Sequence, residues 1–216
     1  VYVISSPLKI NRQNLFLFGE AGVQFDTPPT EISIIQIANG HTGPAIEFDH
    51  VASNIVDGTE YGIFNMEDLM VSAPYGTTGS DGTPCPIIDL SGCVSSSLNR
   101  VGTVGNNGLT SACGVRINGW YRNSITNSDI GRYCDNGIEI YAVKNDQNLG
   151  FVDGWTRPTH NIQITGNSIG NEINAPDYGI VIEGGTYGVH NVIIENNLFF
   201  NSTYGISIAG SNENIT

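Results

Sequence analysis

Short stretches in which apolar and polar residues alternate recur along the chain, separated by turns rich in glycine and asparagine. The clearest unit is Gly-apolar-x-apolar, whose glycines follow one another at intervals of 23, 42 and 26 residues. Its four copies lie at 114–117, 137–140, 179–182 and 205–208. Successive side chains of a strand point to opposite faces, so this alternation predicts strands with one buried face.

A second unit precedes the later copies, at 124–130, 162–169 and 192–198. In it, Asn167 and Asn197 align one repeat apart, and Ser128 lies one repeat earlier. Such polar ladders satisfy the backbone of tight turns inside a stack, so we expect a structural role for these three side chains.

The first third of the chain follows the same pattern less regularly. Strands are predicted at 15–19, 32–37 and 63–69, with earlier members of the Gly-apolar-x-apolar column at 45–48 and 87–90. Irregular insertions interrupt the repeat near 71–86 and 141–160. Binding functions usually reside on such insertions into a regular scaffold.

Together the repeats predict an all-β fold, a right-handed single-stranded parallel β-helix that forms one domain over residues 1–216. Its period is too short for a propeller blade, and it lacks the helix of a leucine-rich repeat. The chain begins without Met and ends within the repeat at Thr216. We interpret it as a fragment of a longer solenoid, whose open end near Ile215 neighbouring sequence or a partner should cover.

The composition is that of an acidic, strand-rich protein. It includes 27 glycines and 21 Asp and Glu against 8 Lys and Arg, for a net charge of −13. This balance argues against nucleic acid and anionic membrane surfaces as partners. It suits a neutral glycan, a cationic ligand or bound calcium, or it serves solubility alone. No apolar run approaches the ~20 residues of a membrane span.

Four cysteines leave two alternatives open. Cys85 with Cys93, and Cys113 with Cys134, are spaced so that disulfides can form, but buried free thiols fit a solenoid equally well. The absence of a CxxC pair argues against a zinc site.

The stretches 2–8 and 14–20, with the repeats over 114–216, resemble the pectate-lyase-like β-helix superfamily. That superfamily includes polysaccharide lyases, glycoside hydrolases, sugar epimerases and phage tailspike depolymerases. The resemblance implies a polysaccharide or cell-surface glycan as partner and an extracellular place, secreted or on a virion or cell surface. Its tailspike members also imply a homotrimer. The resemblance specifies architecture and not a reaction.

The outward positions of the Gly-apolar-x-apolar column predict where chemistry can occur. Stacking would bring them into two adjacent files on one outer face. The first file contains Glu47, Asp89, Arg116, Glu139, Val181 and Ser207, and the second Asp49, Ser91, Asn118, Tyr141, Glu183 and Ala209. Neighbouring repeats would place such groups ~5 Å apart and alternate repeats ~10 Å apart, separations that suit the paired carboxylates of glycoside hydrolases.

Two enzymatic interpretations use these residues. In a hydrolase, Asp89 is the expected base and Glu139 or Glu183 the expected acid, while Arg116 keeps its neighbours ionised. For a lyase, the resemblance implies calcium held by acidic residues and a Lys or Arg as base. These three carboxylates could hold the calcium here, with Lys144 or Arg116 as the base. Solvated acidic side chains without a catalytic role are the simpler alternative.

The expected substrate contacts come from the first file and from the second insertion. They are Glu47, Tyr141, Asp153, Trp155 and Arg157. Aromatic rings suit the faces of sugars, although the same rings can instead hold their loops against the solenoid. Two functions therefore remain open, a polysaccharide hydrolase or lyase, and a non-catalytic carbohydrate-binding or structural module such as a tailspike section or adhesin.

Overall fold

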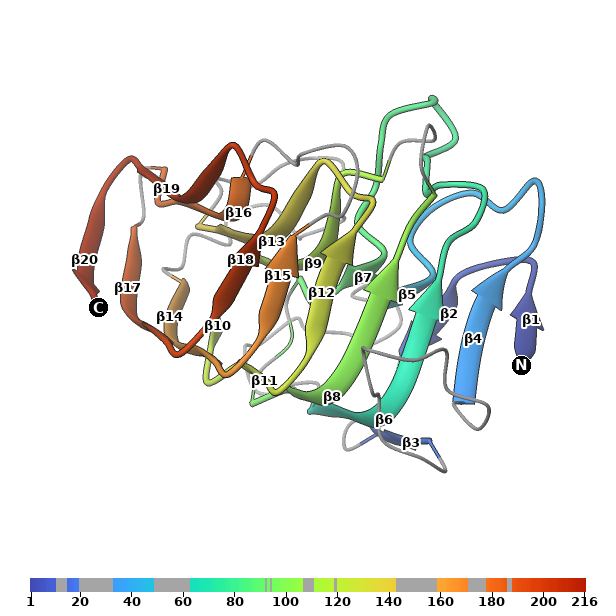
Figure 1. The fold of residues 1–216 in the computed structure, drawn as a ribbon, viewed down its shortest axis with the longest axis horizontal. Coiled ribbons are helices and arrows are strands. Elements are labelled where there is room, and N and C mark those ends of the chain that lie inside the picture. Colours follow the sequence, from blue (N-terminus) through green and yellow to red (C-terminus); the bar gives the residue numbers. More distant parts are fainter. Residues whose placement is uncertain are drawn as a thin grey trace, which may run out of the picture.

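Parallel strands in two sheets make up the regular structure of the chain (Figure 1). The computed structural model describes residues 1–10, 15–19, 33–48, 63–91, 93, 95–106, 111–118, 120–142, 159–170, 178–185 and 188–216. None of these residues lies in a helix, and within them no helical segment exists that is long and apolar enough to span a bilayer. The all-β prediction is confirmed.

Each sheet collects strands from the whole length of the chain. The first sheet has 13 strands: β1 (Tyr2–Ile4), β3 (Leu15–Phe18), β4 (Ser33–Ile37), β6 (Phe64–Ser72), β8 (Ser97–Val104), β10 (Trp120–Tyr121), β11 (Ser124–Thr126), β12 (Asp129–Arg132), β14 (Thr159–Thr165), β15 (Ser168–Gly170), β17 (Val189–Glu195), β18 (Leu198–Phe200) and β20 (Asn212–Ile215). The second has seven: β2 (Leu8–Ile10), β5 (Ile46–Phe48), β7 (Ile88–Asp89), β9 (Cys113–Asn118), β13 (Asn136–Tyr141), β16 (Tyr178–Glu183) and β19 (Tyr204–Ala209).

The order of the strands follows the order of the sequence. In the second sheet it is β2-β5-β7-β9-β13-β16-β19, and each neighbouring pair is parallel. The chain visits the first sheet between these strands, so each pass through both sheets, here called a repeat, stacks on the previous one. Figure 1 shows the strands side by side along the long axis, with the termini at opposite ends. This arrangement is consistent with a β-solenoid.

The first sheet bends at one residue in each repeat. The first half of β6 pairs with β3 and its second half with β4, and β8 pairs in the same way with β11 and β12. The residue at the bend has a positive φ in five repeats: Asp68, Arg100, Asn127, Gly166 and Asn196. Glycine and asparagine tolerate this conformation best, which explains why asparagine-rich turns punctuate the sequence.

Aliphatic side chains from both sheets fill the interior. The inward positions of the second sheet are completely buried: Ile46, Ile88, Val115, Ile117, Ile138, Ile140, Ile180 and Ile182. In β19, which has a neighbour on one side only, Ile206 and Ile208 are 41% and 52% exposed. The predicted inward face of the column is therefore confirmed.

The glycines of the column allow the second sheet to approach the first closely. A Cβ atom on Gly137 would lie 2.4 Å from the carbonyl oxygen of Gly179 and 2.4 Å from Cγ2 of Ile169. One on Gly179 would lie 2.5 Å from Cδ1 of Phe199. These positions exclude any larger residue because the contacting atoms belong to the backbone and the core.

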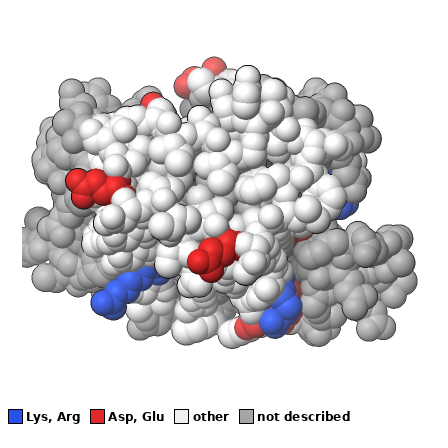
Figure 2. Space-filling model, turned by 60° about the vertical axis from the view of Figure 1, so that its left-hand side comes forward, with Lys and Arg blue, Asp and Glu red and all other residues white. Residues whose placement is uncertain are grey.

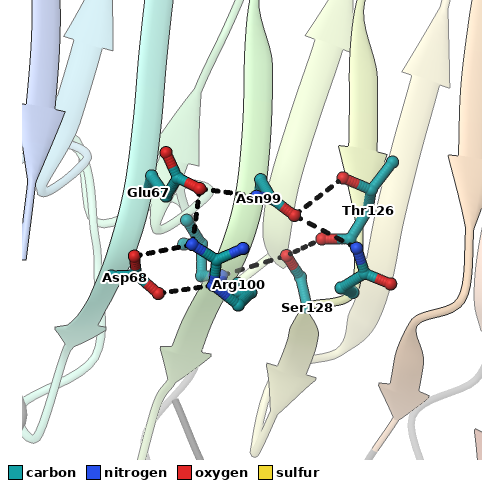
Figure 3. A network of polar contacts seen from close by, with 8 residues as sticks. Glu67, Asp68, Asn99, Arg100, Thr126 and Ser128 are labelled. Carbon is teal, nitrogen blue, oxygen red and sulfur yellow. Dashed lines mark hydrogen bonds and ion pairs between the residues drawn. The ribbon is translucent and has the colours of Figure 1, made fainter. Parts of the chain in front are cut away.

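The predicted polar ladder crosses the bend of the first sheet. Asn167 accepts from the N–H of Ser128 (2.9 Å) and donates from Nδ2 to the carbonyl of Ile125 (2.9 Å). Its own N–H donates to Oδ1 of Asn197 (2.9 Å), and the Ser128 hydroxyl accepts from the N–H of Val101 (3.0 Å; Figure 3). The prediction of a structural role for these side chains is confirmed.

Replacement of Asn167 should therefore destabilise the fold. Asn167→Ala leaves the buried N–H of Ser128 and carbonyl of Ile125 without their partner, so we expect the free energy of unfolding to fall by about 1–3 kcal/mol. Urea denaturation measures the change. Gln163→Ala, at an exposed position of the preceding strand β14, is the control and should change it by less than about 0.5 kcal/mol. Equal losses in both variants would contradict the role of the ladder.

Candidate functional site

Strand pairing brings the outward positions of the second sheet into the expected files. Glu47 pairs with Asp89, Asp89 with Arg116, and Arg116 with Glu139. In the second file Asn118 pairs with Tyr141, and Tyr141 with Glu183. Neighbouring strands of a sheet lie about 4.8 Å apart, so each pair is adjacent on the outer face.

A cavity of about 690 Å³ lies over these files. It is lined by Pro44, Glu47, Gly79, Ser80, Asp81, Thr83, Pro84, Cys85, Pro86, Asp89, Arg116, Asn118, Tyr141 and Glu183. The volume is within the range of sites for small molecules or a few sugar units. The regular sheet forms its floor, and the segment between β6 and β7 forms a wall.

This wall is a closed loop attached to the scaffold. Thr78 forms an antiparallel bridge with Pro84, and the N–H of Gly79 donates to the carbonyl of Thr83 (2.7 Å). Thr77 is fully buried, and its hydroxyl donates to the carbonyl of Cys85 (2.6 Å) while its N–H donates to the hydroxyl of Ser111 (3.1 Å). The wall thus has a fixed position relative to the floor.

A buried ion pair supports the centre of the floor. Arg116 donates from Nε (3.0 Å) and Nη2 (2.9 Å) to one carboxylate oxygen of Glu139, and Asn136 donates to the other (2.9 Å). The side chain of Glu139 is 4% exposed and that of Arg116 21%. Cζ of Arg116 lies 5.7 Å from the centroid of the Tyr141 ring. One oxygen of Glu139 thus holds Arg116 beside Tyr141, and the other is occupied by Asn136.

This environment also determines the ionisation of Arg116 and Tyr141. Burial opposes the charge of Arg116, but the surrounding anionic groups, Glu139 and Asp89 among them, raise its pKa above the ordinary value. Burial, reinforced by Glu139, raises the pKa of Tyr141. At neutral pH Arg116 is therefore a fixed cation and Tyr141 a neutral phenol.

Two carboxylates occupy adjacent strands of the floor beside the wall. Glu47 is paired with Lys9, whose Nζ lies 2.9 Å from Oε1. Asp89 is only 9% exposed, and its Oδ1 accepts from the N–H of Ser91 (2.9 Å). Within the part of the chain that the structure describes, no cation forms an ion pair with Asp89.

The structure brings together most of the predicted site residues that it describes. Asp89, Arg116 and Glu183, with Glu47 and Tyr141, line the cavity, and Glu139 lies beside it under Arg116. The remaining candidates fall outside the described residues: Asp49, Lys144, Asp153, Trp155 and Arg157.

Sequence reasoning missed two parts of the site. Lys9, at the outward position of Leu8–Ile10, pairs in register with Glu47 and could have been found by extending the first file by one repeat. The lining residues of the wall, Asp81 and Cys85 among them, carry no periodic signal. Only the position of their insertion between two strands indicated that they border the site.

Charges elsewhere on the described surface are isolated or already paired. The described part of the face shown in Figure 2 is mostly white, with only a few charged side chains. On β6 and β8, Arg100 donates to both oxygens of Asp68 (2.6 and 2.7 Å) and to Glu67 (2.5 Å), as Figure 3 shows. The hydrogen bonds from Arg100 lower the pKa of Asp68. This closed network leaves the cavity as the stronger candidate site.

Neither similarity to known proteins nor a cluster of metal ligands adds an assignment to this geometry. The chain matches no protein-family model, no curated protein and no solved structure. Among the residues that the structure describes, no three His, Cys, Asp or Glu side chains come together as metal ligands.

The four cysteines are free thiols in the structure, in agreement with the second of the two alternatives. Burial raises the pKa of Cys93 to about 12 and also raises the pKa values of Cys113 and Cys134. Cys85, in the wall of the cavity, is partly exposed, and burial raises its pKa more modestly.

Thiol titration tests this description of the cysteines. With the folded protein at slightly alkaline pH, we expect a chromogenic disulfide reagent to modify Cys85 alone, and faster as the pH rises, because the thiolate is the nucleophile. All four thiols should react in denaturant. Cys85→Ser should abolish the native signal. Rapid native reaction of two or more thiols, or fewer than four in denaturant, would show that the cysteines are not buried free thiols.

Proposed function

We propose that the chain is a section of a right-handed parallel β-helix of the pectate-lyase-like superfamily that degrades an extracellular polysaccharide, in secreted form or on a virion or cell surface. Three observations support the fold: stacked parallel strands, a polar ladder at the bend, and outward files over a repeating core. The cavity over the second sheet is the proposed site of cleavage.

The observation that carries the proposal is the pair of cavity-lining carboxylates Glu47 and Asp89, in register on adjacent strands. A separation of about 5 Å between strand positions corresponds to the carboxyl spacing of retaining glycoside hydrolases. In such enzymes one carboxyl group attacks the sugar and the other protonates the leaving oxygen. We therefore assign the chemistry to this pair, with Arg116 and Tyr141 as contacts for the neighbouring sugar.

Glu139 takes a different part in this proposal. Because Arg116 and Asn136 occupy both of its oxygens, we assign it as a positioning residue that orients Arg116. Glu183, farther along the second file, contributes to substrate binding in the same cavity.

A hydrolase fits these groups better than a lyase. A lyase that uses Arg116 as its base needs the neutral guanidine, and the raised pKa of Arg116 opposes that form. Lys144, the other candidate base, lies outside the described residues. The ultraviolet absorbance of unsaturated products distinguishes the two reactions, and we expect none.

One observation favours a non-catalytic carbohydrate-binding module as the second candidate. Glu47 is neutralised by Lys9, and Arg116 by Glu139, so two charges of the floor are engaged within the protein. Such a floor can hold a glycan without cleaving it.

Substitution of the proposed pair tests the cleavage. We expect a glycan from a broad panel of cell-surface and extracellular polysaccharides to be cleaved, and Glu47→Gln and Asp89→Asn each to lower the rate at least about 100-fold. A reducing-sugar assay measures the rate, and thermal unfolding confirms that the variants fold.

Glu195→Gln, on the exposed face of the first sheet, is the matched control and should leave the rate unchanged. If both variants of the pair keep full activity, the assignment is wrong. If no glycan of the panel is cleaved but one binds, the carbohydrate-binding module replaces the enzyme.

A further inference from the structure

The charges around the cavity do not cancel. Glu47 is paired with Lys9, and Arg116 with Glu139. Three further carboxylates line the cavity, those of Asp81, Asp89 and Glu183, and none of them has an ion-pair partner within the described residues. The side chains in and beside the cavity therefore include five carboxylates against two cationic groups, a formal excess of three negative charges.

Asp89 is the most deeply buried of the three carboxylates. Its side chain is only 9% exposed, and the N–H of Ser91 is its one hydrogen-bond donor among the described residues. Arg116 is its neighbour in the file, but the guanidinium is bound to Glu139, so a further cationic group that enters the cavity gains more free energy here than at the surface.

The arrangement of the carboxylates suits separate ammonium groups better than one metal ion. No three potential ligands come together within the described residues. Asp89 on β7 and Glu183 on β16 are three strand positions apart in the second sheet, which corresponds to about 14 Å. One cation cannot contact both carboxylates, whereas a chain with repeated positive charges can.

Asp81 extends the acidic lining to the wall. The hydroxyl and the N–H of Thr83 donate to its Oδ1 (2.6 and 3.0 Å), and these hydrogen bonds lower the pKa of Asp81. Its negative charge therefore persists into mildly acidic solution, where amines are fully protonated.

We propose that the substrate is a polysaccharide with free amino groups, whose ammonium groups pair with Asp89, Glu183 and Asp81 along the cavity. This inference rests on the proposed function only in taking a polysaccharide as the ligand. An acidic chain can bind neutral or cationic glycans, and these carboxylates favour the glycans that carry amino sugars.

Binding measured apart from cleavage tests the inference. Isothermal titration calorimetry with β-linked glucosamine oligomers and their N-acetylated counterparts should show at least about tenfold tighter binding of the amines, weakened by added salt. Asp89→Asn and Glu183→Gln should each reduce the affinity for the amines about tenfold. Because Glu183 is at an exposed position, Glu183→Gln is the variant that least disturbs folding. Glu195→Gln should bind as the unaltered protein does.

Equal affinity for both oligomers, or no binding of the amines, would overturn the inference, as would oligolysine binding as tightly as the amino sugars. The outcomes separate it from the proposed function. Amino-sugar oligomers that bind but are not cleaved contradict the enzyme and support the inference. A neutral glycan cleaved through Glu47 and Asp89 without preference for amines supports the enzyme and contradicts the inference.

Discussion

The register of the parallel strands in the second sheet is the constraint on which the rest of the structure depends. Inward aliphatic residues such as Ile88, Val115 and Ile138 are completely buried and stack from repeat to repeat, so a slip of one residue would turn the core outward. The same register fixes the outward residues between them. The order of the groups on the cavity floor therefore follows from the packing of the core.

The polar ladder and the glycines also help to maintain this strand register. Asn167 satisfies backbone groups where the first sheet bends, and Gly137 permits the second sheet to lie close against the first. Both allow successive repeats to pack closely. On that scaffold the cavity brings together Glu47, Asp81, Asp89, Arg116 and Glu183.

Much of this arrangement could be predicted from the sequence because it is periodic. The alternation of apolar residues in 137–140 and 179–182 specifies strands, faces and register, and Asn167 and Asn197 mark the ladder. Aperiodic features could not be predicted. The wall formed around Thr77 depends on its hydrogen bonds to distant residues, and the burial of Glu139 depends on side-chain packing with Arg116 and Asn136. Glu139 therefore looked from the sequence like a free acid.

The register is tested most directly by distances between spin labels in one outward file, measured by pulsed electron paramagnetic resonance in a Cys85→Ser background. Lys9 and Ser207 are six strand positions apart, and Lys9 and Val181 five. Cysteines that replace these residues pairwise should give narrow distributions near about 29 and 24 Å, one strand spacing apart. Broad distributions, or two distances that do not differ by about 5 Å, would contradict the stacked register and with it the proposed site.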